Sequence, residues 1–428
     1  MGAAFLLALR TTGIELMRRV LWLSNGHGED TIACELIRVW QGCFPEDQHQ
    51  AMALVGEGKA YAQLNIPLVT ETFTPPSAGF AYLHPRRLWQ DVRQGLVGHF
   101  YQQWQYLKAC FHMESALAKR CADQMLCIAV GDVVPLTLLW LTGGLSPERA
   151  DRTLFLACAL SDYYTAGKSC FDPFQVGLLR RYRVPTYTRD ALTAHNLVAR
   201  GVRAQCLGNP MRDAVQCQGA PPLALTRSGV HALLLPGSHQ DALLNLEAVL
   251  PLLTSLNEAG GLVASVQWHI LYATEQDRSR FTACLDTWRS QGTNARGSAC
   301  ATSQPFITLL PARQFGHGLR QCDFALGFSG TGNEQCVAHG LPVISFPGPA
   351  GVQQYTPAFG EAQQRLLGSA LRFYPQMTPE LLRWQIDHLL RYTELYRTQA
   401  KQVGQARFGE PGSALRLVHH MREKEANP

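Results

Sequence analysis

Short apolar runs alternate with amphipathic stretches along the chain, and this alternation predicts strands and helices in turn. In the first half we expect strands at 19–24, 52–55, 126–130 and 154–160, and a helix over 31–40. In the second half we expect strands at 232–235, 262–269, 307–309, 324–328 and 343–346, and helices over 241–256 and 333–338. Because strands alternate with helices throughout, the pattern predicts doubly wound parallel sheets, whose ligands bind at the carboxyl ends of the strands.

The two halves of the chain start alike, each with a strand, a glycine-containing loop and a helix, and this predicts two domains. A length of 428 residues also fits two domains of about 200 residues each. Gly208, Asn209 and Pro210 interrupt the periodic pattern between the halves. We expect an N-terminal extension at 1–18, a first domain at 19–212, a linker at 213–228, a second domain at 229–412, and a C-terminal helix and tail at 413–428 that cross back toward the first domain. The predicted fold class is α/β, with two Rossmann-like domains facing a cleft.

The most informative segment lies directly after the predicted strand at 324–328. It reads Ser329, Gly330, Thr331, Gly332, Asn333, Glu334 and Gln335. Glycines let a backbone approach a ligand closely, and the first N–H groups of a helix carry partial positive charge, so this turn suits a phosphate group without a metal. The carboxylate of Glu334, one turn into the helix, could reach the ribose hydroxyls of a nucleotide. The segment therefore predicts a nucleotide-sugar site.

A second phosphate contact is expected at the next strand-to-helix turn, where Gly237, Ser238 and His239 precede the helix at 241–256. Other nucleotide and hydrolase signatures are incomplete. Thr31 stands where the third glycine of a dinucleotide fingerprint would fall, and the stretch at 327–331 lacks the final glycine of a nucleophile elbow. A Walker loop is incomplete too, because Asp162 stands where the first glycine of that motif would precede Gly167-Lys168-Ser169.

Candidate acid–base residues lie in the first half. Asp132 ends the apolar strand at 126–130 and precedes a hydrophobic helix, so burial could raise its pKa and suit it as a general base. The alternative is that Asp132 is only the N-cap of that helix. His27, on the loop at 25–30, is a second candidate base or a diphosphate contact, against the alternative of an ordinary polar loop residue.

The composition narrows the class of protein. With 46% hydrophobic and 17% charged residues, the chain is typical of a well-buried globular protein. A net charge of +5 is too mild to suggest a nucleic-acid binder. The 13 cysteines are scattered without a Cys-x-x-Cys pair or a zinc-like cluster, so we expect no metal site, no cofactor and a cytoplasmic location. No apolar run reaches the roughly 18 residues that a membrane-spanning helix needs.

The segment at 80–113 departs from the alternation of apolar strands and amphipathic helices because it is both aromatic and basic. It includes Trp89, Arg93, Tyr101, Trp104 and Lys108. Such a helical surface is typical of contact with a lipid interface, where the protein would lie peripherally on the cytoplasmic face of a membrane. The alternative is a buried helix pair that packs on the sheet.

Several motifs in order along almost the whole chain, from about 19 to 415, resemble the lipid-A-disaccharide synthase-related family of two-domain GT-B glycosyltransferases. They are Leu-Ser-Asn-Gly-His-Gly-Glu-Asp (23–30), Val-Gly-Asp-Val-Val-Pro-Leu (130–136), Ser-Asp-Tyr-Tyr (161–164), Arg-Asp (189–190), Leu-Gly-Asn-Pro-Met-Arg-Asp (207–213), Leu-Leu-Pro-Gly-Ser (234–238) and Ser-Gly-Thr-Gly-Asn-Glu-Gln (329–335). Two positions depart from that pattern: His239 replaces the usual arginine, and the stretch at 348–352 replaces a tighter Gly-x-Gly-Pro.

The resemblance implies that the first domain holds the acceptor and the second holds the nucleotide-sugar. The acceptor side would include Asn25, Gly26, Gly28 and Asp30. Gln353 and Gln354, followed by Tyr355, are similar to the sugar-contacting Gln-Gln-Tyr of the transferase that adds N-acetylglucosamine to a peptidoglycan lipid. The expected activity is metal-independent, inverting transfer of a hexosyl group from a UDP-sugar to a lipid-linked or amphipathic acceptor. A UDP-N-acetylglucosamine 2-epimerase-like enzyme and a non-catalytic nucleotide-sugar binding protein are the alternatives.

Overall fold

The structure, a computed structural model, shows a chain that forms two compact units. It describes residues 18–74, 89, 92–117, 125–149, 152–215, 221–223, 229–237, 241–258, 260–294, 306–352 and 355–426. Unit 1 runs to Ser161 and also contains Ser169–Pro210 and the chain from Gly412 onward. Unit 2 contains Met211–Pro411 together with the short segment Asp162–Lys168, which the sequence pattern had assigned to the first domain.

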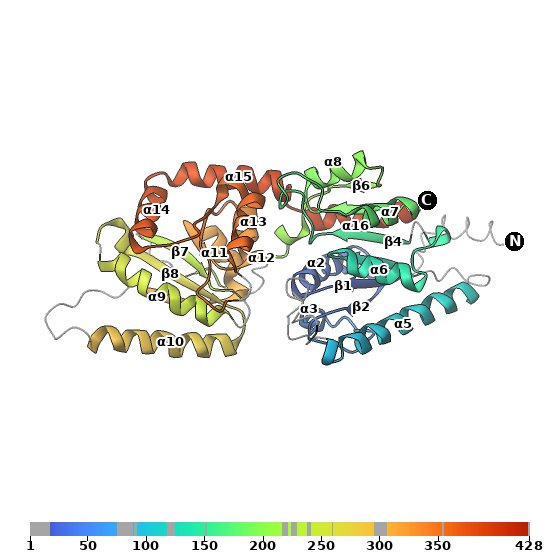
Figure 1. The fold of residues 1–428 in the computed structure, drawn as a ribbon, viewed down its shortest axis with the longest axis horizontal. Coiled ribbons are helices and arrows are strands. Elements are labelled where there is room, and N and C mark those ends of the chain that lie inside the picture. Colours follow the sequence, from blue (N-terminus) through green and yellow to red (C-terminus); the bar gives the residue numbers. More distant parts are fainter. Residues whose placement is uncertain are drawn as a thin grey trace. The chain divides into compact units, whose positions relative to one another are not determined.

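Unit 1 is built on a six-stranded parallel sheet with helices on its faces (Figure 1). Its strands are β1 (Arg19–Ser24), β2 (Gln48–Ala53), β3 (Leu126–Val130), β4 (Thr153–Ala157), β5 (Thr186–Thr188) and β6 (Ala204–Gln205). Its helices are α2 (His27–Cys43), α3 (Lys59–Gln63), α5 (Leu96–Leu117), α6 (Val133–Thr142), α7 (Pro173–Arg181), α8 (Ala191–Ala199) and α16 (Ser413–Ala426), with a short 3₁₀ turn η2 (Pro147–Arg149). The strand order is β2-β1-β3-β4-β5-β6, so the order reverses between β1 and β3.

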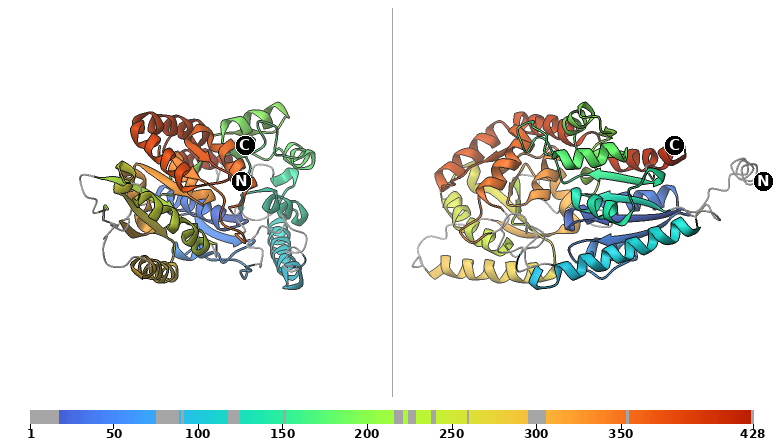
Figure 2. Two further views of the ribbon diagram at one scale, coloured as in Figure 1. Left: turned by 60° about the vertical axis from the view of Figure 1, so that its left-hand side comes forward. Right: turned by 45° about the vertical axis from the view of Figure 1, so that its right-hand side comes forward.

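Unit 2 is built on a second six-stranded parallel sheet, which Figure 2 shows from two further sides. Its strands are β7 (Val230–Leu235), β8 (Val266–Tyr272), β9 (Ile307–Pro311), β10 (Phe324–Gly327), β11 (Val343–Ser345) and β12 (Leu371–Phe373). Its helices are α9 (Ala242–Glu258), α10 (Glu275–Asn294), α11 (Phe315–Gln321), α12 (Gly330–Ala338), α13 (Pro357–Leu367), α14 (Pro379–Arg391) and α15 (Thr393–Phe408). Short 3₁₀ turns are η3 (Pro210–Arg212), η4 (Leu262–Ser265), η5 (Ala312–Gln314) and η6 (Gly368–Ala370).

The sheet of unit 2 has the strand order of a Rossmann fold. Written from one edge it reads β9-β8-β7-β10-β11-β12, and every neighbouring pair is parallel. The order reverses between β7 and β10, and ligands of such folds bind beside the carboxyl ends of the strands at this point. The predicted fold class, two Rossmann-like α/β domains, is confirmed.

Two helices begin earlier than the sequence pattern predicts. We expected α2 to start at Thr31, but it starts at His27, where the backbone N–H of Asp30 donates to the carbonyl of Gly26 at 2.9 Å. Gly26 has φ 144°, which favours glycine and lets the helix follow the strand almost directly. We expected α12 to start at Asn333, but Ser329 is its N-cap and Gly330 its first residue. The glycine-rich stretches are therefore helix starts and not loops.

Three of the predicted strands differ from the structure by three residues or more at one end or both, and β5, β6 and β12 were not predicted. The edge strand β2 begins at Gln48, four residues before the predicted 52, because its first residues are polar and partly exposed. Parallel strands read as continuous apolar runs only where both faces are covered. Strand β4 ends at Ala157 and not at 160, and the stretch Leu262–Ser265 is a 3₁₀ turn after Gly261, which has φ 76°.

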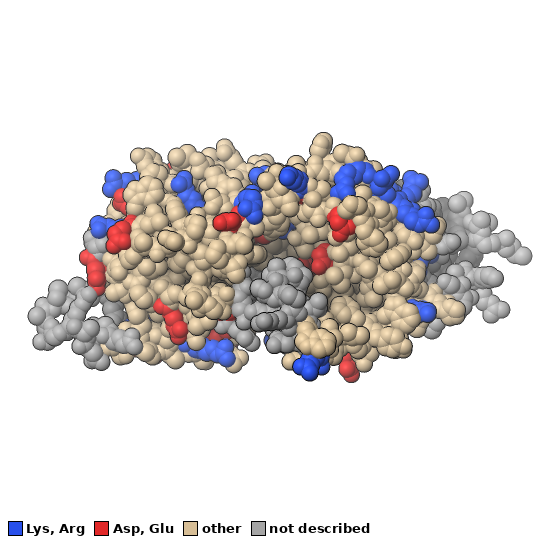
Figure 3. All heavy atoms as spheres, viewed as in Figure 1, with Lys and Arg blue, Asp and Glu red and all other residues tan. Residues whose placement is uncertain are grey.

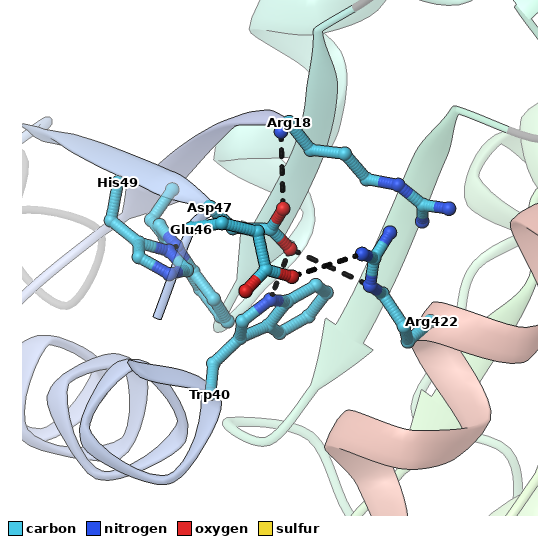
Figure 4. Close-up of polar contacts among 7 residues, drawn as sticks. Arg18, Trp40, Glu46, Asp47, His49 and Arg422 are labelled. Atoms are coloured by element: carbon cyan, nitrogen blue, oxygen red, sulfur yellow. Dashed lines mark hydrogen bonds and ion pairs between the residues drawn. The ribbon is translucent and has the colours of Figure 1, made fainter. Parts of the chain in front are cut away.

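The C-terminal helix α16 packs against α2 within unit 1, and a buried ion-pair cluster fixes it there (Figure 4). The carboxylate of Asp47 accepts hydrogen bonds from the backbone N–H of Arg18 at 3.0 Å and from Trp40 Nε1 at 2.9 Å. Arg422 of α16 lies 3.5 Å from Asp47 and 3.5 Å from Glu46. The side chain of Asp47 is fully buried, so its oxygens bond to these partners and not to water.

Candidate functional site

In unit 2, two loops converge where the strand order reverses. Strand β7 is followed by Pro236 and Gly237, and β10 by Phe328 and Ser329. The backbone N–H of Phe328 donates to the carbonyl of Leu235 at 2.8 Å. Gly237 has φ 106°, and a Cβ atom there would lie 3.4 Å from the carbonyl oxygen of Phe328. The predicted glycine at 237 therefore lies beside the start of α12, at the place where this fold class binds ligands.

The start of α12 offers backbone N–H groups to a ligand. Ser329 Oγ accepts a hydrogen bond from the N–H of Gly332 at 3.1 Å and so caps the helix. The first N–H groups of a helix have no acceptor within the helix, which leaves those of Gly330 and Thr331 directed out of its N-terminal end. Thr331 is exposed. The positive end of the helix dipole favours an anion there.

A buried polar network fixes this helix start from below. Asn333 is fully buried, and its Nδ2 donates to Tyr355 Oη at 3.0 Å and to Gln363 Oε1 at 2.9 Å. Ser345 Oγ lies 2.7 Å from the same tyrosine oxygen. Gln363 Nε2 donates to the carbonyl of Gly330 at 2.8 Å, which ties α13 to the first turn of α12. Asn333, predicted to contact the donor, thus has its side chain inside the unit.

Gly327 makes room for this network. A Cβ atom at Gly327 would lie 1.8 Å from Asn333 Oδ1, so a larger residue at the end of β10 would displace the Asn333 side chain. Tyr355, which follows the predicted sugar-contacting glutamines, is 2% exposed and faces the network. Burial raises its pKa, so the tyrosine stays neutral. Its role here is to support α12.

Glu334 lies on the same face of α12 as Gly330, four residues earlier. It is 5% exposed, and its Oε1 accepts a hydrogen bond from the hydroxyl of Tyr164 at 3.1 Å. Tyr164 belongs to Asp162–Lys168, the segment that unit 2 takes from the first half of the chain. A carboxylate and the N–H groups of a helix start therefore lie along one face of α12, as recognition of a ribose and its phosphates requires.

In unit 1, the carboxyl ends of β1 and β3 bring Asn25 and Asp132 together. Asn25 Nδ2 lies 3.2 Å from Oδ1 and 3.1 Å from Oδ2 of Asp132. Oδ1 also accepts the backbone N–H of Val134 at 2.9 Å, so Asp132 is the N-cap of α6. Burial raises the pKa of Asp132, while the hydrogen bonds from Val134 and Asn25 lower it. The alternative reading of this aspartate as an N-cap is correct, and a role as base remains compatible with its position.

A second carboxylate, Glu29, lies at the same edge and was given no role from the sequence. A Cβ atom at Gly26 would lie 2.9 Å from Glu29 Oε2, and one at Gly131 would lie 2.8 Å from Glu29 Cγ. The two glycines thus leave the space that this side chain fills. The pKa of Glu29 is raised to about 7, chiefly by burial and also by the negative charges of Asp132 and Asp30, against the lowering effects of a backbone hydrogen bond and of Arg189. In the sequence, the only signal for Glu29 was its place in the motif at 23–30.

The other residues predicted on the acceptor side are placed differently. Asp30 is 1% exposed and its Oδ1 accepts a hydrogen bond from Ser24 Oγ at 2.6 Å, so it faces the interior. Burial raises the pKa of Asp30 to about 6. Gly28 and His27 belong to the first turn of α2. Desolvation, and then the nearby Lys59 ammonium, lower the pKa of His27 and favour its neutral form, which can accept a proton.

Some predicted donor contacts lie outside the described residues, namely Ser238, His239, Gln353 and Gln354. Gln335 is described, and its Nε2 donates to the carbonyl of Met211 at 3.4 Å. Across the ranges that the structure describes, no three His, Cys, Asp or Glu residues are grouped so that they could hold a metal ion.

Helix α5 contains most of the described part of the aromatic and basic segment predicted at 80–113, and it has two distinct faces. One face is buried on β2, where Gln103 Nε2 donates to the carbonyl of Ala53 at 3.3 Å. On the opposite face Val97, Tyr101 and Lys108 are exposed, and Trp104 is partly buried against the core. Tyr101 and Trp104 stack at 5.7 Å, and Lys108 lies 4.6 Å from the Trp104 ring. Core packing therefore explains only one face of this helix.

Basic side chains also gather on one face of unit 1, over the region of α7 and α8 (Figure 3). Exposed arginines there are Arg180, Arg181, Arg183 and Arg203.

Among the helices that the structure describes, none has the length and apolar character to span a membrane.

The whole chain shares its architecture with solved structures of low sequence identity. It is similar to UDP-GlcNAc 2-epimerase from Neisseria meningitidis bound to UDP-GlcNAc, with a TM-score of 0.54, 12% identity, and coverage of 95% of this chain and 100% of that one. It is similar to MnaA of S. aureus in complex with UDP, with a TM-score of 0.54, 12% identity, and coverage of 95% and 96%. It is also similar to MurG from Acinetobacter baumannii, with a TM-score of 0.52, 14% identity, and coverage of 95% and 99%.

These likenesses establish the fold, a two-domain α/β architecture of the GT-B type. No protein-family model matches the sequence, and no curated protein does. The resemblance to the lipid-A-disaccharide synthase-related family therefore stays a prediction from the motifs.

Proposed function

We propose that the protein is a glycosyltransferase that moves a hexosyl group, of N-acetylhexosamine type, from a UDP-sugar to a lipid-linked or amphipathic acceptor. One observation carries the proposal. At the point where the strand order of unit 2 reverses, the capped start of α12 presents N–H groups, and the same helix face carries the buried carboxylate of Glu334. Two of the structurally similar proteins were solved with UDP or UDP-GlcNAc, which supports the same ligand class here.

In this proposal unit 2 holds the donor. The N–H groups of Gly330 and Thr331 bind the diphosphate, with Gly237 contributing from the neighbouring loop, and Glu334 binds the ribose. When the bond from the anomeric carbon to the diphosphate breaks, negative charge develops on the departing UDP. Preoriented N–H groups stabilise that charge without rearranging, so the transfer needs no metal.

Unit 1 would hold the acceptor and the base. The acceptor oxygen attacks the anomeric carbon from the side opposite the leaving UDP, which inverts the configuration, and its proton passes to a carboxylate. Asp132 and Glu29 are the two candidate carboxylates at the carboxyl ends of β1 and β3. The pKa of Glu29 is raised to about 7, which suits a base that must also release its proton. His27 is the third candidate.

An amphipathic acceptor fits the aromatic face of α5, on which Tyr101 and Lys108 are exposed and Trp104 is partly buried. Aromatic rings flanked by a lysine, as in Tyr101, Trp104 and Lys108, are typical of helices that contact a lipid interface. We propose that this face holds the protein peripherally on the cytoplasmic side of a membrane.

A 2-epimerase-like reaction is the second candidate, because the similar structures include a UDP-GlcNAc 2-epimerase. Such an enzyme changes the UDP-sugar without any acceptor. A protein that binds the nucleotide-sugar without turnover is the third.

The test is UDP release from UDP-GlcNAc and UDP-glucose, with and without lipid-linked monosaccharides in detergent micelles, in EDTA. The proposal predicts release that depends on the acceptor and is lost in Glu334→Ala. An epimeric UDP-sugar formed from donor alone would establish the second candidate instead. Binding without release or epimerisation would establish the third. Activity of Asp132→Asn near that of the wild type would remove Asp132 as the base, and Glu29→Gln is the matched variant.

A further inference from the structure

The segment Asp162–Lys168 is held on unit 2 by contacts that could not be predicted from its sequence. It follows β4, a strand of unit 1, yet it clusters with unit 2. Arg365 Nε of α13 donates to the carbonyl of Tyr164 at 2.9 Å. The guanidinium of Arg407, from α15, lies 3.4 Å from the centroid of the Tyr163 ring. Two helices of unit 2 therefore hold the two tyrosines of this segment.

The backbone of the segment is also folded on itself. The N–H of Gly167 donates to the carbonyl of Asp162 at 2.7 Å, and that of Ala166 to the carbonyl of Tyr163 at 3.3 Å. These turns, together with the arginine contacts, fix the backbone position from which the Tyr164 side chain extends. Its hydroxyl is a preoriented donor, and it is aimed at Glu334 Oε1 at 3.1 Å.

The partner of this hydroxyl is the residue that the proposed function assigns to the ribose. A carboxylate is an acceptor only, with about four lone-pair sites on its two oxygens. The hydrogen bond from Tyr164 takes one of these sites, and it restricts rotation of the carboxylate. Without it, a glutamate side chain with three rotatable bonds would have to be ordered when the ligand binds.

We infer that Tyr164 is a positioning residue for ribose recognition, because its hydroxyl holds the Glu334 carboxylate in the orientation that accepts the ribose hydroxyls of a uridine diphosphate. The inference rests on the proposed function, since it takes Glu334 as the ribose contact. It adds that specificity for a ribonucleotide depends on a residue that follows a strand of unit 1 in the chain. Tyr164 acts through Glu334 and need not touch the ligand.

The test compares the affinities of UDP and 2′,3′-dideoxy-UDP, measured by isothermal titration calorimetry. The wild type is expected to bind UDP more tightly. Tyr164→Phe is expected to weaken UDP about tenfold, the loss that follows from one hydrogen bond to a charged group, and to change the affinity for the dideoxy ligand less than about twofold. Tyr392→Phe, which alters an exposed tyrosine of unit 2, is the matched control.

A double-mutant cycle separates positioning from general loosening of the site. In a Glu334→Gln background, Tyr164→Phe should have little further effect on UDP, because the two changes remove the same interaction. Equal weakening of both ligands by Tyr164→Phe, an unchanged UDP affinity, or tighter UDP binding would each overturn the inference. The last result would mean that Tyr164 competes with the ribose. If wild-type protein binds UDP no better than the dideoxy ligand, the assignment of Glu334 fails first, and the inference with it.

Discussion

Replacing Glu29 by Gln should remove a pH dependence from the stability of unit 1. The carboxyl group of Glu29 has a pKa of about 7 in the folded protein against an ordinary value of 4.5, chiefly because it is desolvated. The folded state therefore binds this proton more tightly than the unfolded state does. Glutamine has the same shape as a protonated glutamate and cannot ionise, so it preserves the packing beside Gly26 and Gly131 and removes the titration.

The sign and size follow from linkage. Below pH 4.5 both states are protonated and the stabilising contribution of the proton is complete. As the pH rises from 4.5 to 7, the unfolded state releases its proton first, so the wild type loses stability, and above 7 the loss is complete. A pKa difference of about 2.5 is worth about 3 kcal/mol, which is roughly 6–12 °C in Tm for a cooperative unit of about 200 residues.

The assay is calorimetric unfolding of both proteins between pH 4 and 8.5, with the difference in Tm plotted against pH. The Tm of Glu29→Gln minus that of the wild type should rise steadily from about pH 4.5 and reach a plateau above about pH 7. Glu394→Gln, at an exposed position of α15, controls for the loss of one negative charge. Parallel Tm curves for Glu29→Gln and the wild type would show that Glu29 ionises normally, and would remove the reason to consider it as a base.

Three further predictions concern the network below α12, the anchor of α16 and the aromatic face of α5. Asn333→Leu should lower the unfolding free energy by about 2–4 kcal/mol, measured by urea denaturation, because it removes the buried hydrogen bonds to Tyr355 and Gln363; a change below about 0.5 kcal/mol would contradict the network. Asp47→Ala should cost about 3–5 kcal/mol in the same measurement, since it removes the buried partner of Arg422, and resistance of α16 to proteolysis should fall with it. The double variant Tyr101→Ala and Trp104→Ala should reduce flotation with anionic vesicles at low salt while UDP binding stays unchanged, whereas equal flotation would exclude this face as the lipid contact.

Much of the fold could be predicted because the central strands are covered on both faces. A buried parallel strand has to be apolar throughout, and β1 and β3 accordingly occupy the ranges that the pattern predicts. The polar edge strand β2 gave a weaker signal. Helix starts at Gly26 and Ser329 were placed too late, because a glycine or serine at the end of a strand is equally typical of a loop and of a helix cap.

The site could be predicted only where its chemistry is local in the sequence. The stretch 329–335 combines its cap, its glycines and Glu334 within one helix turn or two, so it could be singled out from the sequence as a candidate site. The pairing of Asn25 with Asp132 spans 107 residues, and that of Tyr164 with Glu334 spans 170. No periodic pattern encodes such contacts. Asn333 and Asp30 illustrate the reverse error, since polar residues within a binding motif can be the ones that face the core.

The most direct test of the central claim is whether the start of α12 and Glu334 form a uridine nucleotide site. Thermal unfolding should be measured in EDTA with UDP, UDP-GlcNAc, UDP-glucose, GDP and NAD, for the wild type and for Glu334→Ala. Ligands that bind only the folded state raise the Tm by mass action, by an amount set by their affinity. We predict a rise with the uridine nucleotides alone, lost in Glu334→Ala. Three results would contradict the assignment: a rise in Tm with NAD alone, no rise in Tm with any of the nucleotides, or a rise with the uridine nucleotides that persists in Glu334→Ala.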